Sequence, residues 1–492
     1  AGGERMDLDE TTLADIFKQA GYVTGIFGKW HNGMQYPYHP NGRGFDEFYG
    51  FASGHWGDYF SPNFLERNGS LVQGEGYIVD DFTNKAISFI EKHREGPFFA
   101  MLTYNTPHSP MQVPDEWWQR VTDRGIEMYH REPELEDTAF TIAALAMVEN
   151  IDWNVGRLTD KLQELGIEDN TIVIYMSDNG PNSWRWNGGM KGRKGSIHEG
   201  GVRSPLFIKW PEGIQKNLEI NEIASGIDIL PTLADLSGIS VETNHPLDGV
   251  SVKPLLLQES GSWNSRLIYS HWNGRTSVRS QKWRLNDEGN LFDIAQDRGQ
   301  QNDVSSQYPD IAEELADSLK KWEMQVLSEL KSRDEDDRPF PVGHPEFPYT
   351  QLPARDGIPH GNLERSNRFP NDTFFRNWSS LSDSVTWDVE VLDSGTFEAE
   401  LYYTLPEENE GAVMELSFGG NSVSETIQVA HDPPPRGMEH DRIERQESYV
   451  KEFISLKMGT IELESGRDIL TLKAIELPGS GGPDVRLLML TR

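Results

Sequence analysis

Five side chains suited to catalysis or ligand binding stand in three short polar clusters. Lys29 and His31 belong to the first cluster, His108 to the second, and Asp178 and Asn179 to the third. The side-chain oxygens of Asp178 and Asn179 suit a hard cation such as Ca²⁺ or Mg²⁺ rather than zinc. A cation beside a lysine and histidines makes a pocket for a tetrahedral oxyanion, where charge that develops in a transition state is stabilised.

Taken singly, each cluster also has an ordinary structural explanation. Asp178-Asn179-Gly180 is a common turn sequence. A single histidine after a strand is more often a hydrogen-bonded loop residue than a catalyst, and Lys29 suits a solvated surface. The prediction of an oxyanion site therefore rests on the combination of the three clusters.

Each cluster follows a short apolar stretch that reads as a buried strand, at residues 22–27, 98–104 and 171–176. Amphipathic helices are predicted between these strands, at 80–94 and 136–165. Continuous apolar strands that alternate with helices indicate a parallel sheet covered on both faces. Ligands of such sheets bind beyond the carboxyl ends of the strands, so we expect the three clusters to converge at one edge.

Further elements extend the same layer. A helix capped by Asp9 or Thr11 is expected before the first strand. Residues 204–210 and 227–236 read as another strand and helix. Between these elements, residues 191–203 are rich in glycine and basic although the whole protein carries a formal net charge of −34. A flexible surface loop is one explanation, but such a charge contrast favours anion binding.

Composition excludes several classes of protein. The acidic balance argues against a general nucleic-acid binder, because attraction to phosphate needs clustered Lys and Arg. If the substrate is an anion, a local cationic pocket must capture it against the field of the whole protein. The chain has no Cys, so it has no disulfides. No apolar run approaches the roughly 18 residues that a membrane span needs, and no signal peptide opens the chain.

The second half of the chain changes character. Four closely spaced short strands at 266–271, 276–279, 282–286 and 290–293 read as an antiparallel meander, with a helix from Pro309 to about Leu330 behind it. From about Asn371 the chain alternates apolar and polar residues between turns, which predicts a β-sandwich. We expect an α/β domain at 1–262, an antiparallel subdomain at 263–335, a proline-rich linker at 336–370 and the β-sandwich at 371–492.

The order of the motifs resembles the sulfatase family over residues 9–330. The blocks that carry the resemblance are Gly28-Lys29-Trp30-His31-Asn32-Gly33, Gly44-Phe45-Asp46, Pro107-His108-Ser109-Pro110, Ser177-Asp178-Asn179-Gly180, residues 193–203, Asp228-Ile229-Leu230-Pro231-Thr232-Leu233, residues 247–251 and residues 290–293. Single motifs are weak evidence, but their number and order are specific. Asn32 departs from the pattern, which usually has Leu there. The resemblance implies an alkaline-phosphatase-like mixed sheet between helices.

The resemblance also implies a reaction and residue roles. It implies sulfate-ester hydrolysis with one calcium ion, which Asp178 and Asn179 would help to bind. Lys29 and Lys194 would contact the sulfate oxygens. His31 would hold the nucleophile, and His108 would contact the bridging oxygen as the general acid.

In such enzymes the nucleophile is a formylglycine made from a Cys/Ser-x-Pro-x-Arg motif, upstream of the region that matches here. This sequence contains neither that motif nor the family's other pair of calcium-binding Asp residues. They would lie upstream in the natural protein, have been cleaved or replaced, or be missing from a non-catalytic relative. The first explanation is favoured because the downstream ligands are all present.

The all-β tail looks like the β-sandwich of some bacterial polysaccharide sulfatases. Its loop at 430–449 is rich in His, Arg and Pro, which fits either a solvated loop or a cationic surface that reaches the site. Aromatic and basic residues suit a sulfated glycan; the candidates for contacting the sugar are His39, His55, Trp56, Trp184, Arg185, Trp186 and Arg193. Such a substrate implies a periplasmic or secreted enzyme. A phosphoester or phosphonate-ester hydrolase with two metals, and a non-catalytic protein that binds sulfated glycans, are the alternatives.

Overall fold

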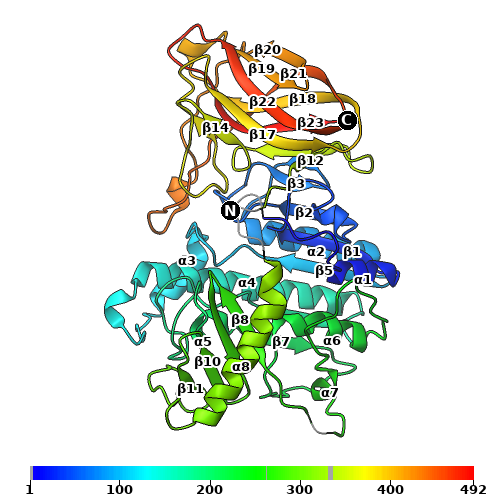
Figure 1. Ribbon diagram of the computed structural model, residues 1–492, viewed down its shortest axis with the longest axis vertical. Helices are drawn as coiled ribbons and strands as arrows, with labels where there is room; N and C mark the ends of the chain where they lie inside the picture. The colour runs from blue at the N-terminus through cyan, green and yellow to red at the C-terminus, as the bar shows by residue number, and fades with distance from the viewer. Residues whose placement is uncertain (1–3, 262, 331–335) are drawn as a thin grey trace. The chain divides into compact units, whose positions relative to one another are not determined.

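The computed structural model describes residues 4–261, 263–330 and 336–492 (Figure 1). The chain forms two compact units. The first unit combines residues 1–120, 143–158 and 338–492, and the second combines residues 121–142 and 159–337. The long helix α4 (Thr138–Glu164) contributes its middle to the first unit and its ends to the second.

The first unit contains a five-stranded sheet with the strand order β4-β3-β2-β1-β5. Its strands are β1 (Val23–Lys29), β2 (Glu47–Phe51), β3 (Leu65–Arg67), β4 (Ser70–Val72) and β5 (Phe98–Thr103), and its helices include α1 (Leu13–Gln19), α2 (Ile78–His93) and α3 (Asp115–Asp123). The predicted cap of α1 is wrong: the residue is Thr12, not Asp9 or Thr11. The Thr12 hydroxyl accepts from the backbone N–H of Asp15, and the backbone N–H of Thr12 donates to the Asp15 carboxylate. That reciprocal pair satisfies two otherwise free donors at the start of the helix.

β1 is the strand that brings two of the predicted clusters together. It pairs in parallel with both β2 and β5, and its register places Gly28 opposite Gly50 and Thr103. The two parallel neighbours β1 and β5 therefore end at the same edge, as predicted for the clusters of Lys29 and His108. Gly28 has a φ of 130°, and a Cβ there would lie 2.2 Å from the carbonyl oxygen of Thr103. Only glycine permits this approach.

The third predicted strand does not extend this sheet. β6 (Val173–Met176) belongs to the second unit, where it pairs antiparallel with β7 (Leu206–Lys209) in a two-stranded sheet. A parallel pairing needs a long crossover, usually helical, and the connection from β6 to β7 contains only the single-turn helix α5 (Glu199–Val202). Because β6 lies in the other unit, the convergence of its polar cluster with the first two stays a prediction.

The predicted meander of the second unit is confirmed. Its strands β8 (Ile268–Trp272), β9 (Arg275–Arg279), β10 (Trp283–Asn286) and β11 (Leu291–Asp293) pair in sequence order. The helix α8 (Pro309–Val326) packs Leu315 and Leu319 against Val278, Leu285 and Leu291 of the meander. The helices α6 (Ile229–Leu236) and α7 (Lys253–Leu256) also belong to this unit. Residues 331–335 of the predicted subdomain lie outside the described residues.

The predicted β-sandwich is confirmed as two antiparallel-rich sheets with one shared core. One sheet has the order β12-β17-β22-β19-β20, with β14 also on β17, and the other has the order β15-β16-β23-β18-β21, with β13 also on β23. The later strands are β16 (Phe375–Arg376), β17 (Ser384–Val391), β18 (Gly395–Thr404), β19 (Val413–Phe418), β20 (Asn421–Thr426), β21 (Ile454–Leu463), β22 (Gly466–Glu476) and β23 (Asp484–Thr491). Alternate residues of β17 point inward, as a half-buried strand requires.

The predicted linker at 336–370 is wrong. It contains β12 (Phe340–Val342), β13 (Tyr349–Pro353), β14 (Ile358–His360) and β15 (Glu364–Arg365), each paired within the sandwich. Three of the prolines that suggested a linker, Pro341, Pro353 and Pro359, instead lie in these short strands, and the others lie outside them. The sandwich therefore begins near Phe340 rather than at Asn371.

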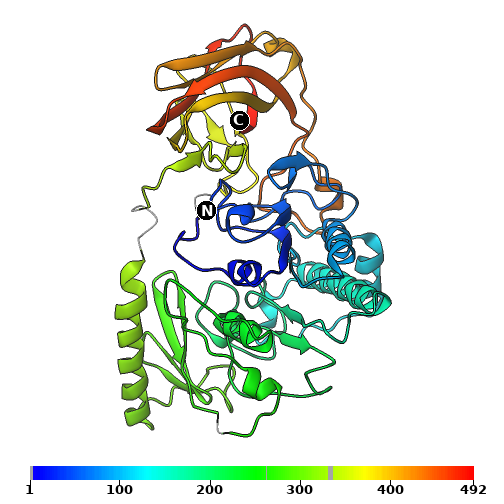
Figure 2. The ribbon, with the colours of Figure 1, turned by 90° about the vertical axis from the view of Figure 1, so that its right-hand side faces the viewer.

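The sandwich has a hydrophobic core of its own, but it falls in the same compact unit as the sheet of β1. Buried polar pairs join them: the side chain of Gln35 donates to the carbonyl oxygen of Gln351 at 2.7 Å, and that of Gln351 donates to Glu66 at 2.8 Å. The backbone N–H of Gly57 donates to Asp372. Figure 2 shows the orange loop that leaves the sandwich and runs along the blue part of the same unit.

The contact between β1 and β5 predicts a specific weakness. We expect Gly28→Ala to lower the free energy of unfolding by about 3 kcal/mol or more, because a Cβ would force the strands apart. Gly21→Ala is the control, since Gly21 also has a positive φ but no atom within 4 Å of the added Cβ; it should cost only about 1 kcal/mol. Chemical denaturation of both variants checks this, and equal losses would contradict the argument.

Candidate active site

The end of β1 places Lys29 and His31 together. His31 has a φ of 63°, a backbone conformation that is rare for residues other than glycine. Such strain persists only where the surrounding structure enforces it, and it is common at functional sites. Trp30 fixes the turn, because its backbone N–H donates to Phe51 at 2.9 Å and its indole N–H donates to Tyr38 at 3.0 Å.

The environment of His31 keeps its imidazole neutral. Burial and the charge of Lys29 lower the pKa of His31 to about 4, although Glu4 acts in the opposite direction. The Nε2 atom of His31 is buried and makes no hydrogen bond to any residue that the structure describes. A neutral imidazole with a free ring nitrogen can bind a hydroxyl or another polar group that comes close.

His108 faces a second histidine. The rings of His55 and His108 are nearly parallel, with an interplanar angle of 6° and centroids 6.3 Å apart. Burial, the neighbouring His108 and the charge of Lys29 lower the pKa of His55 to about 3. The Nε2 atom of His55 is also buried and unbonded within the described residues. We call Lys29, His31, His55 and His108 the histidine cluster.

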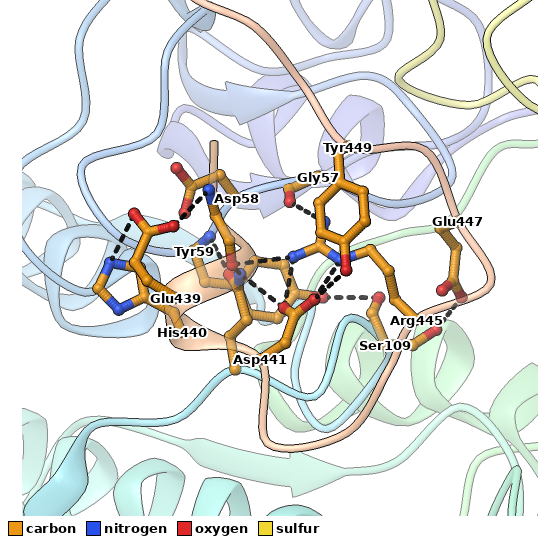
Figure 3. A network of polar contacts seen from close by, with 12 residues as sticks. Gly57, Asp58, Tyr59, Ser109, Glu439, His440, Asp441, Arg445, Glu447 and Tyr449 are labelled. Atoms are coloured by element: carbon orange, nitrogen blue, oxygen red, sulfur yellow. Dashed lines mark hydrogen bonds and ion pairs between the residues drawn. The ribbon is translucent and has the colours of Figure 1, made fainter. Parts of the chain in front are cut away.

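The main chain around His108 is held by a buried tyrosine (Figure 3). The hydroxyl of Tyr59 donates to the carbonyl oxygens of His108 and Ser109, at 3.0 and 2.9 Å. Nδ1 of His108 lies 2.8 Å from the carbonyl oxygen of Ser109, so it must carry the proton in this hydrogen bond. The lone pair of the neutral ring is then on Nε2.

Two of the predicted sugar-binding residues are placed elsewhere. His39 is buried, donates from Nε2 to Glu66 and packs against Phe48 and Phe347, so it has a structural role. Trp56 is also buried, where it stacks on Phe51 and lies beneath the guanidinium of Arg486. Neither side chain offers a surface to a substrate, and both predictions are corrected.

The second unit contains a pocket of about 380 Å³. We call it the cationic pocket, because four of its lining side chains carry positive charge: Arg131, Lys191, Arg193 and Lys194. Glu132, Trp184 and His198 also line it. Burial and the charge of Lys191 lower the pKa of His198 to about 4. The glycine-rich loop thus supplies Lys191, Arg193 and Lys194 to one pocket of a protein with a net charge of −34, and its binding of an anion stays a prediction.

Backbone hydrogen bonds join the glycine-rich loop to the cluster of Asp178. The N–H of Gly180 donates to the carbonyl oxygen of Gly201 at 2.9 Å, and that of Lys194 donates to Pro181 at 2.8 Å. A Cβ on Gly180 would lie 1.9 Å from the carbonyl oxygen of Gly200. The two motifs, distant from each other in the sequence, therefore lie side by side in this unit.

A buried carboxylate holds the loop against the meander. Glu199 accepts from Arg284 at 2.9 Å and from Arg279 and Arg203 at 3.2 Å each. Burial raises the pKa of Glu199, but the charges of Arg284 and Arg279 outweigh it and leave the pKa below its ordinary value. The role of Glu199 was not predicted from the sequence. The feature that could have indicated it is a single Glu inside a basic loop, together with the arginines Arg279 and Arg284 of the meander.

The other predicted sugar-binding residues lie around this pocket to different degrees. The guanidinium of Arg193 lies 4.9 Å from the centre of the Trp184 ring, and both residues line the pocket. Arg185 and Trp186 are not among the lining residues; Arg185 reaches Ser183, and Trp186 is 58% exposed. A residue that the sequence analysis missed is Trp272, whose indole nitrogen would lie 3.4 Å from a Cβ on Gly195.

Asp178 and Asn179 offer the donor types that calcium prefers, but not enough of them. Asp178 is exposed, and the side-chain N–H of Asn179 donates to Gly180 at 2.8 Å, which leaves its oxygen available. Calcium takes six to eight oxygens. In the described ranges no group of three or more His, Asp or Glu residues could hold a metal. Asp178 and Asn179 therefore form only part of a calcium ligand set.

Comparison with known protein families places these motifs. Residues 4–239 match the family model described as sulfatase, and residues 193–325 match the model described as N-sulphoglucosamine sulphohydrolase, C-terminal. Residues 4–325 belong to the sulfatase family. The predicted family and the α/β fold class are therefore confirmed.

Several curated sulfatases resemble the chain. The uncharacterized sulfatase YdeN of Escherichia coli (strain K12) is 31% identical over 298 residues, which are 54% of this chain and 51% of YdeN. The N-acetylgalactosamine-6-sulfatase of Mus musculus is 29% identical over 291 residues, 54% of this chain and 52% of that protein. The chain thus spans about half the length of these curated relatives.

Solved structures share the fold. Ps i-CgsB is 29% identical, with a TM-score of 0.58 over 65% of this chain and 76% of that protein, and it has also been solved in complex with k-i-k-neocarrahexaose. Within the described part of this sulfatase-family chain, no helix is both long and apolar enough to cross a membrane.

The buried position of Glu199 predicts a pH-dependent stability. We expect Glu199→Gln to destabilise the second unit by about 3–5 kcal/mol, because Arg284 would stay buried without its counter-charge. The stabilisation by Glu199 is present above its ordinary pKa of 4.5 and is lost as the pH falls through its lower folded pKa, so the difference between the proteins should shrink there.

Thermal unfolding measured between pH 3 and 7 checks this prediction. Glu288→Gln is the matched control, because Glu288 pairs with Arg275 at the surface and should matter by less than about 1 kcal/mol. A loss from Glu199→Gln no larger than that of the control would contradict the argument.

Proposed function

We propose that the protein hydrolyses sulfate esters on a carbohydrate. The observation that carries the proposal is the pocket lined by Lys194 and Arg193 in a strongly acidic sulfatase-family chain. Long-range charge would repel an anionic substrate from this protein, so local cations must capture it. Arginine adds planar, paired hydrogen bonds that fit sulfate oxygens as they fit phosphate.

We propose the following roles for the side chains. Lys29 and Lys194 bind sulfate oxygens and stabilise the charge that develops on them. The neutral ring of His31 holds the nucleophile through a hydrogen bond. His108, in its doubly protonated form, donates a proton to the bridging oxygen as the ester bond breaks, while its Nδ1 stays hydrogen-bonded to the carbonyl oxygen of Ser109.

Two further components are part of the proposal. Calcium, bound in part by Asp178 and Asn179, would supply positive charge for the sulfate group. A formylglycine would supply the nucleophile. Both follow from the resemblance of the motifs to the sulfatase family.

We propose a sulfated glycan as the substrate. Relatives are named as a sulfatase of N-acetylgalactosamine and as a protein solved with a neocarrahexaose. Trp184 and Arg193 stack at the cationic pocket, and Trp272, 53% exposed, lies beside Gly195. Aromatic faces and guanidinium groups suit sugar rings and their sulfates. A sulfated polymer is met outside the cytoplasm, which favours a periplasmic or secreted enzyme.

Sulfate release from sulfated oligosaccharides by the full-length protein tests the reaction. We expect His108→Ala to lower the rate by about 10²–10⁴-fold with an unchanged circular dichroism spectrum, because the leaving oxygen would lose its proton donor. Full activity of His108→Ala would remove it as the general acid. Absence of sulfate release by the unsubstituted protein, with glycan binding retained, would favour a non-catalytic binding protein instead.

Substitution of Lys194 tests the pocket. Lys194→Ala should lower kcat/KM by about 10²-fold, because one stabilising charge on the sulfate is lost. Lys216→Ala, which removes an exposed lysine, is the control and should leave kcat/KM within two-fold. Equal kcat/KM in both variants would contradict the assigned role.

Metal analysis of the full-length protein separates the related hydrolases. One calcium ion per chain is the expected result. Two transition-metal ions per chain would instead favour a phosphoester or phosphonate-ester hydrolase.

A further inference from the structure

The segment that carries His108 is hydrogen-bonded to a loop of the β-sandwich. We call residues 431–450 the sandwich loop. Its Asp441 forms a β-bridge with Gln112, and the backbone N–H of Arg442 donates to the carbonyl oxygen of Met111 at 3.0 Å. The guanidinium of Arg442 adds a hydrogen bond to the carbonyl oxygen of Val113 at 2.7 Å. The loop and the His108 segment thus form one continuous hydrogen-bonded structure.

The sandwich loop is itself fixed by a buried ion pair (Figure 3). Arg445 binds Asp441 through two nitrogens, and the side chains of both residues are almost fully buried. Arg445 also donates to the carbonyl oxygen of Gly57, and Tyr449 donates to Asp441 at 3.0 Å. Paired hydrogen bonds between buried charges leave little freedom, so the residues that follow Arg445 have a defined position.

The Arg445–Asp441 ion pair positions Glu447 next to the histidine cluster. The hydroxyl of Ser109 donates to the Glu447 carboxylate, and the same hydroxyl oxygen lies 3.4 Å from Nδ1 of His108. Because the hydroxyl hydrogen is committed to Glu447, it does not compete for Nδ1, which keeps its proton for the carbonyl of Ser109. Glu447 therefore favours the ring form in which Nδ1 of His108 carries a proton.

Glu447 also sets the charge balance around the two rings. Lys29 and Arg445 both oppose protonation of His55, and Glu447 favours it. Burial raises the pKa of Tyr59, which holds the His108 main chain; the charges of Glu447 and Asp372 add to this increase, and the charge of Arg445 opposes it.

We propose that Glu447, supplied by the sandwich loop, is a positioning residue of the active site: it orients the His108 ring through Ser109 and supplies the negative charge that favours its proton-donating form. The inference rests on the proposed function, since a proton donor is useful only if an ester bond is cleaved. It makes the β-sandwich part of the catalytic apparatus rather than a separate glycan-binding module.

Three substitutions separate the two effects of Glu447. Glu447→Gln keeps an acceptor for Ser109 but removes the charge. Ser109→Ala keeps the charge but removes the hydroxyl link. Glu447→Ala removes both. Glu444→Gln is the control, because Glu444 lies on the same loop and is exposed.

The full-length protein is assayed for kcat/KM against pH. Glu447→Gln should move the basic limb of the profile to lower pH by about one unit, because the charge that favours the protonated ring is lost. Ser109→Ala should leave the limb in place. Glu447→Ala should lower kcat/KM by about 10–100-fold, and Glu444→Gln should change nothing beyond two-fold. An unchanged profile in both Glu447 variants overturns the proposal.

A second measurement does not depend on turnover. In ¹⁵N-histidine-labelled protein at neutral pH, the ring signals of His108 should report protonated Nδ1, with the same pattern in Glu447→Gln and a shift toward protonated Nε2 in Glu447→Ala. His108→Ala assigns the signals. Unchanged His108 signals in Glu447→Ala overturn the proposal, whereas expected signals without any sulfate release by the unsubstituted protein overturn the proposed function instead.

Discussion

The side chain of Gln112 connects three parts of the first unit. Its amide oxygen accepts from the backbone N–H of Tyr59 at 2.7 Å, and its amide nitrogen donates to the carbonyl oxygen of Gly437 at 2.6 Å and to Asp441 at 3.0 Å. The residue is fully buried. Buried polar groups must find partners, so the segment of His108, the chain around Tyr59 and the sandwich loop can satisfy this amide only in one arrangement. The geometry of the histidine cluster depends on that constraint.

The second unit uses charge in the same way. A basic loop rich in glycine has little tendency to hold one shape, and its lysines and arginines repel one another. Glu199 ties the loop to the meander, because it accepts hydrogen bonds from Arg284 and Arg279. The backbone hydrogen bonds of Gly180 and Lys194 join the loop to the cluster of Asp178. The buried carboxylate of Glu199 thus anchors the loop whose lysines and arginines line the pocket.

Local patterns predicted much of this molecule. Apolar runs that end in polar clusters predicted β1, β5 and β6, and alternating residues predicted most of the sandwich strands. The motifs around Lys29, His108, Asp178 and Lys194 are the basis of the proposed site, whose residue roles stay predictions. What failed was long-range: the pairing of β6, the strands hidden among prolines at 340–365, and the packing of His39 and Trp56. Glu447 was also missed, because its importance comes from Ser109, which is distant from it in the sequence. Such partners follow from tertiary packing, which no local pattern encodes.

The strands at 340–365 have a consequence for how this protein can change over evolutionary time. Tail domains joined by a flexible linker are readily gained, lost or exchanged, since few contacts cross the boundary. Here residues 351–372 form hydrogen bonds with Gln35, Glu66 and Gly57. A recombination event that replaced the tail would leave those groups buried without partners. The sandwich is therefore inherited with the sheet it packs on, and substitutions on either side of that contact should be tolerated mainly in compensating pairs.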